Sequence, residues 1–151
     1  LDGATTRGPI SPPMRELIQH VEGLICGSGF VPALTGCSDL WEAGEAALEL
    51  GPRVVVQTEG KDGSYTVTRS ERFHIPAFDV EVIDTTGTGD VFHGAYLVGL
   101  LKGWNLKQVT LFSTAVAALK CARLGGRQGI PRFEQVMEFL SQRGIHIEDE
   151  G

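Results

Sequence analysis

The stretch Arg53-Val54-Val55-Val56-Gln57-Thr58 gives the clearest indication of the fold. Three consecutive valines are typical of a strand buried on both faces, as in the interior of a parallel sheet. A helix is predicted before it, over 39–50, and Gly51-Pro52 ends that helix. Before the helix, Gly23–Cys26 is a second candidate for a buried strand. Strands that alternate with helices predict an α/β fold, an open and mostly parallel sheet covered by helices.

The rest of the chain supplies further elements of such a fold. Lys61-Asp62-Gly63 predicts a hairpin turn into a strand at 65–68, and Val80–Ile83 is another short strand candidate. Leu1-Asp2-Gly3 is either the end of one more strand or a flexible terminus. Helices are expected at 12–21 and 39–50, capped by Ser11 and Ser38, and at 90–101, 106–123 and 132–143. At 151 residues, one compact domain is the expected organisation.

Composition narrows the function classes. With 42% hydrophobic and 21% charged residues, the chain has the composition of a soluble globular domain. A net charge of −6 argues against a nucleic-acid partner, and no apolar run approaches the ~20 residues that cross a bilayer. Cys26, Cys37 and Cys121 are too scattered for a disulfide framework or a zinc site. We therefore expect reduced thiols in a cytoplasmic protein with neither membrane nor nucleic-acid partners.

The segment that carries the chemistry is Asp84-Thr85-Thr86-Gly87-Thr88-Gly89-Asp90-Val91-Phe92-His93-Gly94-Ala95. It lies between a predicted strand and a predicted helix. Gly87 and Gly89 let the backbone curl so that successive N–H groups face one hollow, and the positive end of the helix faces it too. Gly87, Thr88 and Gly89 are thus predicted to form an anion hole for a phosphate. Asp90, in the first helical turn, could accept a proton from an attacking hydroxyl.

A simpler interpretation exists for the same residues. Aspartate often caps a helix, so Asp90 could serve only as a cap while the glycines form an ordinary turn. His93 follows directly, but its position in the helix turns it away from Asp90 and predicts packing or surface exposure.

The length of the pattern favours the chemical interpretation. Residues 84–95 resemble the second signature of ribokinase-like (PfkB-family) carbohydrate kinases, D-T-x-G-A-G-D-x-F-x-G, with Thr88 where alanine is usual. The resemblance implies an ATP-dependent phosphotransferase with Asp90 as general base, ATP and Mg²⁺ as cofactors, and a sugar as acceptor. The sequence Phe92-His93-Gly94-Ala95 resembles that of bacterial ketose and sulfo-sugar kinases slightly more than that of ribokinases or nucleoside kinases.

The resemblance also implies a nucleotide site, formed by Thr58, Gly60, Thr114 and Gly126. Thr58 and Gly60 match residues that line the phosphates and ribose, Thr114 falls on the adenine side, and Gly126 belongs to the turn under the base. Both threonines could instead bond only local backbone. In many relatives the residues matching Asp84 and Thr86 hold a monovalent cation such as K⁺.

One departure concerns magnesium. The family usually carries N-x-x-E before a Leu-Thr-Gly turn, and the matching positions here are Gly27 and Phe30, which offer no side-chain oxygen. Mg²⁺ would then depend on the ATP phosphates and water, with Glu59 as a remote candidate. No protein metal site is therefore predicted.

Relatives place most of their sugar site, their first glycine signature and their lid in a preceding half that nothing in 1–151 resembles. The chain is therefore expected to be the C-terminal portion of a single kinase domain, with little activity alone. Its exposed sheet edge could then support self-association into a homo-oligomer. The competing class is a non-catalytic nucleotide-binding or regulatory module, favoured by the missing acid at Gly27 and Phe30.

Overall fold

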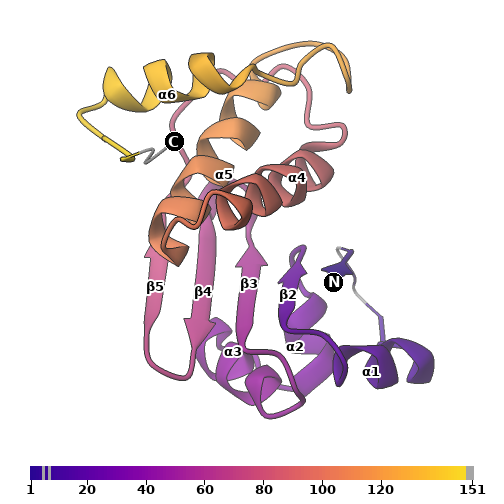
Figure 1. Ribbon diagram of the computed structural model, residues 1–151. Helices are drawn as coiled ribbons and strands as arrows, with labels where there is room; N and C mark the ends of the chain where they lie inside the picture. Colours follow the sequence, from indigo (N-terminus) through magenta and orange to yellow (C-terminus); the bar gives the residue numbers. More distant parts are fainter. Residues whose placement is uncertain (5, 7, 149–151) are drawn as a thin grey trace. The chain divides into compact units, whose positions relative to one another are not determined.

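The computed structural model describes residues 1–4, 6 and 8–148. The chain divides into two compact units, Leu1–Pro76 (unit 1) and Ala77–Gly151 (unit 2), and each has its own architecture. Unit 1 contains the sheet and three α-helices, α1 to α3. Unit 2 contains the other three α-helices, α4 to α6 (Figure 1).

Unit 1 is built on a five-stranded sheet in the order β1-β2-β3-β4-β5. The central strand β3 (Val54–Thr58) pairs in parallel with β2 (Gly23–Cys26), which pairs in parallel with β1 (Asp2–Gly3). On its other side β3 pairs antiparallel with β4 (Ser64–Thr68), and β4 pairs antiparallel with β5 (Arg72–Ile75). The α/β class with an open sheet is confirmed. The sheet is mixed rather than mostly parallel, because two consecutive hairpins extend one side of it.

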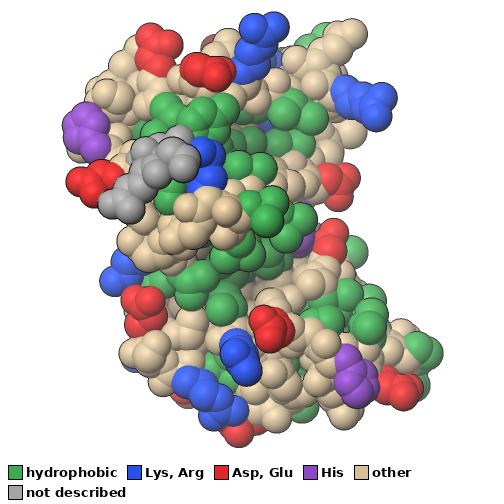
Figure 2. All heavy atoms as spheres, viewed as in Figure 1, with side chains coloured by type: hydrophobic (Ala, Val, Ile, Leu, Met, Phe, Trp, Pro, Cys, Tyr) green, Lys and Arg blue, Asp and Glu red, His purple; other side chains and the backbone are tan. Residues whose placement is uncertain are grey.

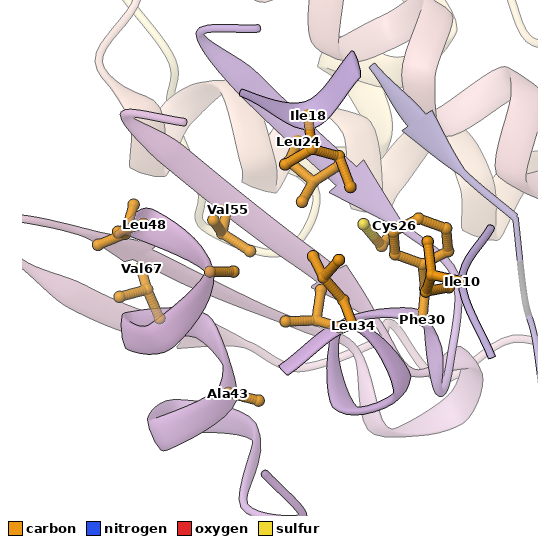
Figure 3. Packing of buried hydrophobic residues seen from close by; sticks show 12 residues of the cluster. Ile10, Ile18, Leu24, Cys26, Phe30, Leu34, Ala43, Leu48, Val55 and Val67 are labelled. Carbon is orange, nitrogen blue, oxygen red and sulfur yellow. The ribbon is translucent and has the colours of Figure 1, made fainter. Parts of the chain in front are cut away.

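The apolar core of unit 1 lies between the sheet and its helices. These are α1 (Pro12–Ile18), α2 (Phe30–Thr35) and α3 (Leu40–Leu48). Figure 3 shows Leu24 of β2 and Val55 of β3 with helix residues such as Leu34 and Leu48 in one cluster. The predicted burial of the valine strand is confirmed, since Val55 and Val56 are completely buried.

Unit 2 contains α4 (Thr88–Leu101), α5 (Leu106–Cys121) and α6 (Phe133–Ser141). Helices α4 and α5 approach closely at Gly99, where an added Cβ would lie 3.1 Å from the Val109 methyl carbons. Aromatic rings pack nearby, with the Trp104 and Phe112 centroids 5.2 Å apart. Hydrophobic side chains of this unit also reach the surface, including Leu97, Leu100 and Leu101 of α4. Figure 2 shows exposed hydrophobic side chains on one face of the molecule.

Several local predictions were wrong. Val80–Ile83 is not a strand: Ile83 donates its N–H to the Cys121 carbonyl at the end of α5 (2.8 Å), and no described segment pairs with it as a ladder. The helix cap at residues 38–39 is Asp39, whose Oδ1 accepts from the Trp41 and Glu42 N–H groups, rather than Ser38. Ser11 precedes α1 but makes no capping bond through its side chain.

Three elements differ from expectation in extent or were not predicted. Helix α2 and strand β5 were not predicted. Helix α4 begins at Thr88 rather than Asp90, so Gly89 is helical and only Gly87 has a positive φ, of 72°. The anion-hole segment is therefore one left-handed residue followed by the first turn of a helix.

Candidate active site

The turn before α4 is held by the carboxylate of Asp84. Its Oδ1 accepts the Thr86 N–H at 2.8 Å, and its Oδ2 accepts the Gly125 N–H at 2.9 Å. One side chain therefore ties the loop that precedes α4 to the loop that follows α5. These hydrogen bonds, from Thr86 first and then Gly125, with the positive charge of Lys120 as a smaller cause, lower the pKa of Asp84 from 3.8 to about 2. The carboxylate is thus ionised at neutral pH.

The hollow at the start of α4 is formed by backbone N–H groups. Gly87 is the N-cap residue in a left-handed conformation, and no side chain caps the helix. Among the hydrogen bonds of the described residues, none uses the N–H of Gly87, Gly89 or Asp90. A Cβ added at Gly87 or Gly89 would meet no other part of the molecule within 4 Å. The donors therefore face open space, the arrangement that binds an anion at a helix N-terminus.

Thr88, the departure from the family pattern, directs its hydroxyl elsewhere. Its Oγ1 donates to the Thr85 carbonyl at 2.8 Å and lies 3.2 Å from the Cys121 sulfur. The hydroxyl is therefore engaged with the turn and with the end of α5.

Asp90 is an exposed residue in the first turn of α4, three positions after the N-cap residue Gly87. Within the described part of the chain, its carboxylate has no hydrogen bond and no ion pair. The capping interpretation is therefore wrong, because a cap would accept the N–H groups of the following turn. His93 bonds through Nδ1 to the Gly89 carbonyl at 2.7 Å, so its ring contacts the helix backbone.

A cavity of about 470 Å³ in unit 2 reaches Asp90. Asp90 is its one polar lining side chain. The other lining residues come from α4, α5, the segment before α6 and the start of α6, and they are Val91, Gly94, Ala95, Val98, Phe112, Val116, Ile130 and Phe133. Such a lining can pack against apolar groups but offers no set of donors and acceptors for the hydroxyls of a sugar.

Two further residues of the predicted nucleotide site lie in unit 2. Thr114 is buried in α5, and its hydroxyl donates to the Thr110 carbonyl at 2.8 Å. This is the local backbone bond that was the simpler interpretation of that residue. Gly126 is exposed in the loop after α5, directly after Gly125, which binds Asp84.

The other predicted residues lie together in unit 1, at the end of β3. Thr58 donates its hydroxyl to the Cys26 carbonyl at 3.0 Å, and Gly60 begins a short 3₁₀ turn with a φ of 55°. Between them, the Oε2 of Glu59 accepts the Ser28 hydroxyl at 2.6 Å, while its buried Oε1 has no partner within the described residues. Phe30 is buried in the core and Gly27 has no side chain, so the acid missing from the sequence is not replaced there.

Sequence reasoning missed Lys120. This residue of α5 is fully buried, its Nζ donates to the Asp84 carbonyl at 2.9 Å, and the ammonium lies 3.7 Å from Asp84 Oδ2. A lysine in a helix ordinarily indicates a solvated face, so only the fold could reveal this contact. No group of three or more His, Cys, Asp or Glu side chains at metal-binding spacing occurs in the described residues.

Comparison with known proteins agrees with this architecture. The model of the pfkB family carbohydrate kinases matches residues 13–132. The ribokinase of Bacillus subtilis is 38% identical over 95 residues, 63% of this chain and 32% of that protein. The crystal structure of a ribokinase from Thermotoga maritima superposes with a TM-score of 0.78 at 36% identity, covering 84% of this chain and 44% of that one.

A putative ribokinase II from E. coli, solved in complex with ATP and Mg²⁺, gives a TM-score of 0.80 at 26% identity, over 85% of this chain and 42% of that one. The chain thus spans about a third of the curated relative and under half of the solved ones. No helix in the described residues is both long and apolar enough to cross a membrane. Because the family match extends over well more than half of its 151 residues, this chain belongs to the pfkB family of carbohydrate kinases and has a ribokinase-like fold.

Proposed function

We propose that this chain is the ATP-binding and catalytic C-terminal portion of a sugar kinase, in which Asp90 is the general base. The observation that carries the proposal is the position of Asp90. Its carboxylate is exposed and without a partner among the described residues, beside a hollow lined by the unused N–H groups of Gly87 and Gly89. Phosphoryl transfer depends mainly on positioning and on stabilising the charge of the transferred group, and a base next to an anion hole contributes to both.

The reaction follows from that placement. A sugar hydroxyl that approaches Asp90 gives its proton to the carboxylate while its oxygen attacks the γ-phosphorus of ATP. The bond to the bridging oxygen breaks and ADP leaves. The N–H groups at the start of α4, together with the helix dipole, stabilise the negative charge on the transferring phosphoryl group. The proton acquired by Asp90 is released to solvent after the product departs.

The nucleotide residues proposed alongside are Thr58 and Gly60 of unit 1 and Thr114 and Gly126 of unit 2. Support comes from the relative that was solved with ATP and Mg²⁺. Mg²⁺ would neutralise charge on the phosphates, and the residues present suit an ion held mainly by ATP and water. Glu59, whose Oε1 is buried without a described partner, is a candidate side chain for orienting such a water.

The acceptor is proposed to be a sugar, bound largely by residues that precede this portion in the complete kinase. The apolar lining of the cavity beside Asp90 supports that division, since recognition of a sugar needs convergent polar groups that this lining lacks. The chain alone should therefore have little kinase activity. The sequence at 92–95 resembles that of ketose kinases, and a ketose as the acceptor stays a prediction.

A non-catalytic nucleotide-binding module is the second candidate, and the absence of an acid at Gly27 and Phe30 favours it. The two candidates differ at Asp90. In the complete kinase, Asp90→Asn should leave ADP affinity within a few fold of wild type and lower turnover by ~10²-fold or more, the contribution of a positioned base.

Isothermal titration with ADP and Mg²⁺ and a coupled ADP-release assay over a panel of sugars measure the two quantities. A complete protein that binds ADP and turns over no sugar, with or without Asp90, would support the binding module. An Asn variant with wild-type turnover would remove Asp90 as the base.

A further inference from the structure

The most unusual charged group outside the proposed phosphate hollow is the ammonium of Lys120. It lies in the last turn of α5 and is completely buried. Burying an ammonium is costly unless other groups replace its water. Here the replacements are the Asp84 carbonyl, which accepts from Nζ at 2.9 Å, and the Asp84 carboxylate, 3.7 Å away.

The ammonium lies within a dense set of contacts between two loops. On one side, Ile83 and Asp84 donate their N–H groups to the Cys121 carbonyl, at 2.8 and 3.1 Å. On the other, the Asp84 carboxylate accepts from Thr86 and Gly125. Lys120 is therefore at the centre of the contacts between residues 83–86 and residues 120–125, which we call the joint. The joint fixes the turn 84–87, and this turn leads into the N–H hollow of α4.

Oxygen atoms around this joint are the kind that would bind a monovalent cation, as the family resemblance implied for Asp84 and Thr86. The residues present do not suit such an ion. The Asp84 carbonyl and one carboxylate oxygen already face a positive charge, both carboxylate oxygens already accept backbone N–H groups, and a second cation beside a buried ammonium would be repelled.

We propose that the Lys120 ammonium takes the place of a monovalent cation in this protein, so that the turn 84–87 and the hollow at Gly87–Asp90 keep their geometry without K⁺. Lys120 is on this view a positioning residue, since it acts through Asp84 and touches neither phosphate nor sugar. The inference rests on the proposed function in one respect: nucleotide affinity serves as a readout of the geometry of the hollow.

The test compares three chloride salts at equal ionic strength: potassium, ammonium, and tetramethylammonium, which is too large for the site. For each, the urea midpoint of the chain and its ADP dissociation constant by calorimetry are measured. Wild type should give the same midpoint, and dissociation constants within about twofold, in all three. A wild-type affinity for ADP that rises more than about fivefold with K⁺ would overturn the proposal. A wild-type urea midpoint that rises with K⁺ would overturn it as well.

Three variants complete the test: one that should respond to the cation and two that should not. Lys120→Ala should weaken ADP binding about tenfold or more in tetramethylammonium, and K⁺ or NH₄⁺ should restore a large part of the loss by entering the space that the side chain leaves. Lys120→Met, which fills much of that space with an apolar side chain, should be weakened but not restored. Lys107→Ala removes one exposed charge near the start of the same helix and should respond to none of the salts.

The outcomes test the role of Lys120 separately from the proposed kinase function. If Lys120→Ala binds ADP as wild type does in all salts, Lys120 does not position the hollow and the proposal is wrong. If the alanine variant does not fold in tetramethylammonium but folds in KCl, the proposal is supported, and if it folds in neither, the wild-type comparison still decides. If no sample binds ADP, the proposed function fails, while the response of the urea midpoints to K⁺ still tests the role of the ammonium.

Discussion

Substitution of the two glycines of the hollow separates backbone strain from phosphate binding. Gly87 has a φ of 72°, and an L-residue in that region costs about 1–2 kcal/mol. Gly89 is helical, so alanine there should stabilise the helix by about 0.5–1 kcal/mol. At neither position would the new methyl group meet other parts of the molecule within 4 Å. Gly87→Ala should therefore destabilise the protein and Gly89→Ala should not, with a difference of about 2 kcal/mol.

The two substitutions should nevertheless have the same effect on the nucleotide. Both place a methyl group beside the N–H groups that face the hollow, so both should weaken ADP binding by calorimetry, whatever they do to the urea midpoint. Gly103→Ala is the matched control, because Gly103 has a φ of 74°, open surroundings and a position just beyond the other end of α4. It should lose stability as Gly87→Ala does and keep its ADP affinity. Wild-type affinity in Gly89→Ala would refute the assignment of the hollow to phosphate.

Two further predictions concern stability. The pKa of Asp84 is lowered to about 2, so its carboxylate stabilises the folded state above pH ~4 and this contribution is lost as the pH falls from about 4 to about 2. Asp84→Asn should therefore flatten the decline of the urea midpoint over that window, and an unchanged pH profile would contradict the assignment. Leu140→Ala in α6, where the side chain is 1% exposed, should cost about 2–5 kcal/mol by urea denaturation, and a loss below 1 kcal/mol would show that the site collapses around the deletion.

The sequence was most informative where one local pattern determines one element. The valine run at 54–56 predicted β3, and Gly63 after Lys61-Asp62 predicted the hairpin into β4. Elements that depend on distant partners were predicted less well. Strand β5 is an edge strand of four residues in which the exposed Arg72 and His74 alternate with half-buried Phe73 and Ile75, and so short an alternation does not identify a strand without its partner β4. Val80–Ile83 has the composition of a strand, but its N–H groups bond the end of a helix.

The same distinction holds within the candidate site. Gly87, Gly89 and Asp90 follow one another in sequence, so their proximity at a helix start could be predicted from the order of residues alone. The contact between Asp84 and Lys120 joins residues 36 positions apart, and the alanine-rich pattern of α5 does not distinguish a buried lysine from an exposed one. Burial of a charge depends on what the fold places around it, which is information that a single helix does not contain.

Asp90 itself bears on whether the chain is catalytic or only binds a nucleotide. A negative charge near the N-terminus of a helix contributes only about 0.3–1 kcal/mol through the dipole, and the carboxylate adds no capping bond to it. That charge lies in the same helical turn as the N–H groups that would receive an anionic phosphate, so it opposes the binding of a nucleotide rather than promoting it. A module that only binds ATP would therefore gain from a neutral residue at this position. An aspartate is useful there if it accepts a proton, because the carboxylate then becomes neutral as charge develops on the phosphoryl group. The placement of Asp90 thus favours the kinase over the binding module.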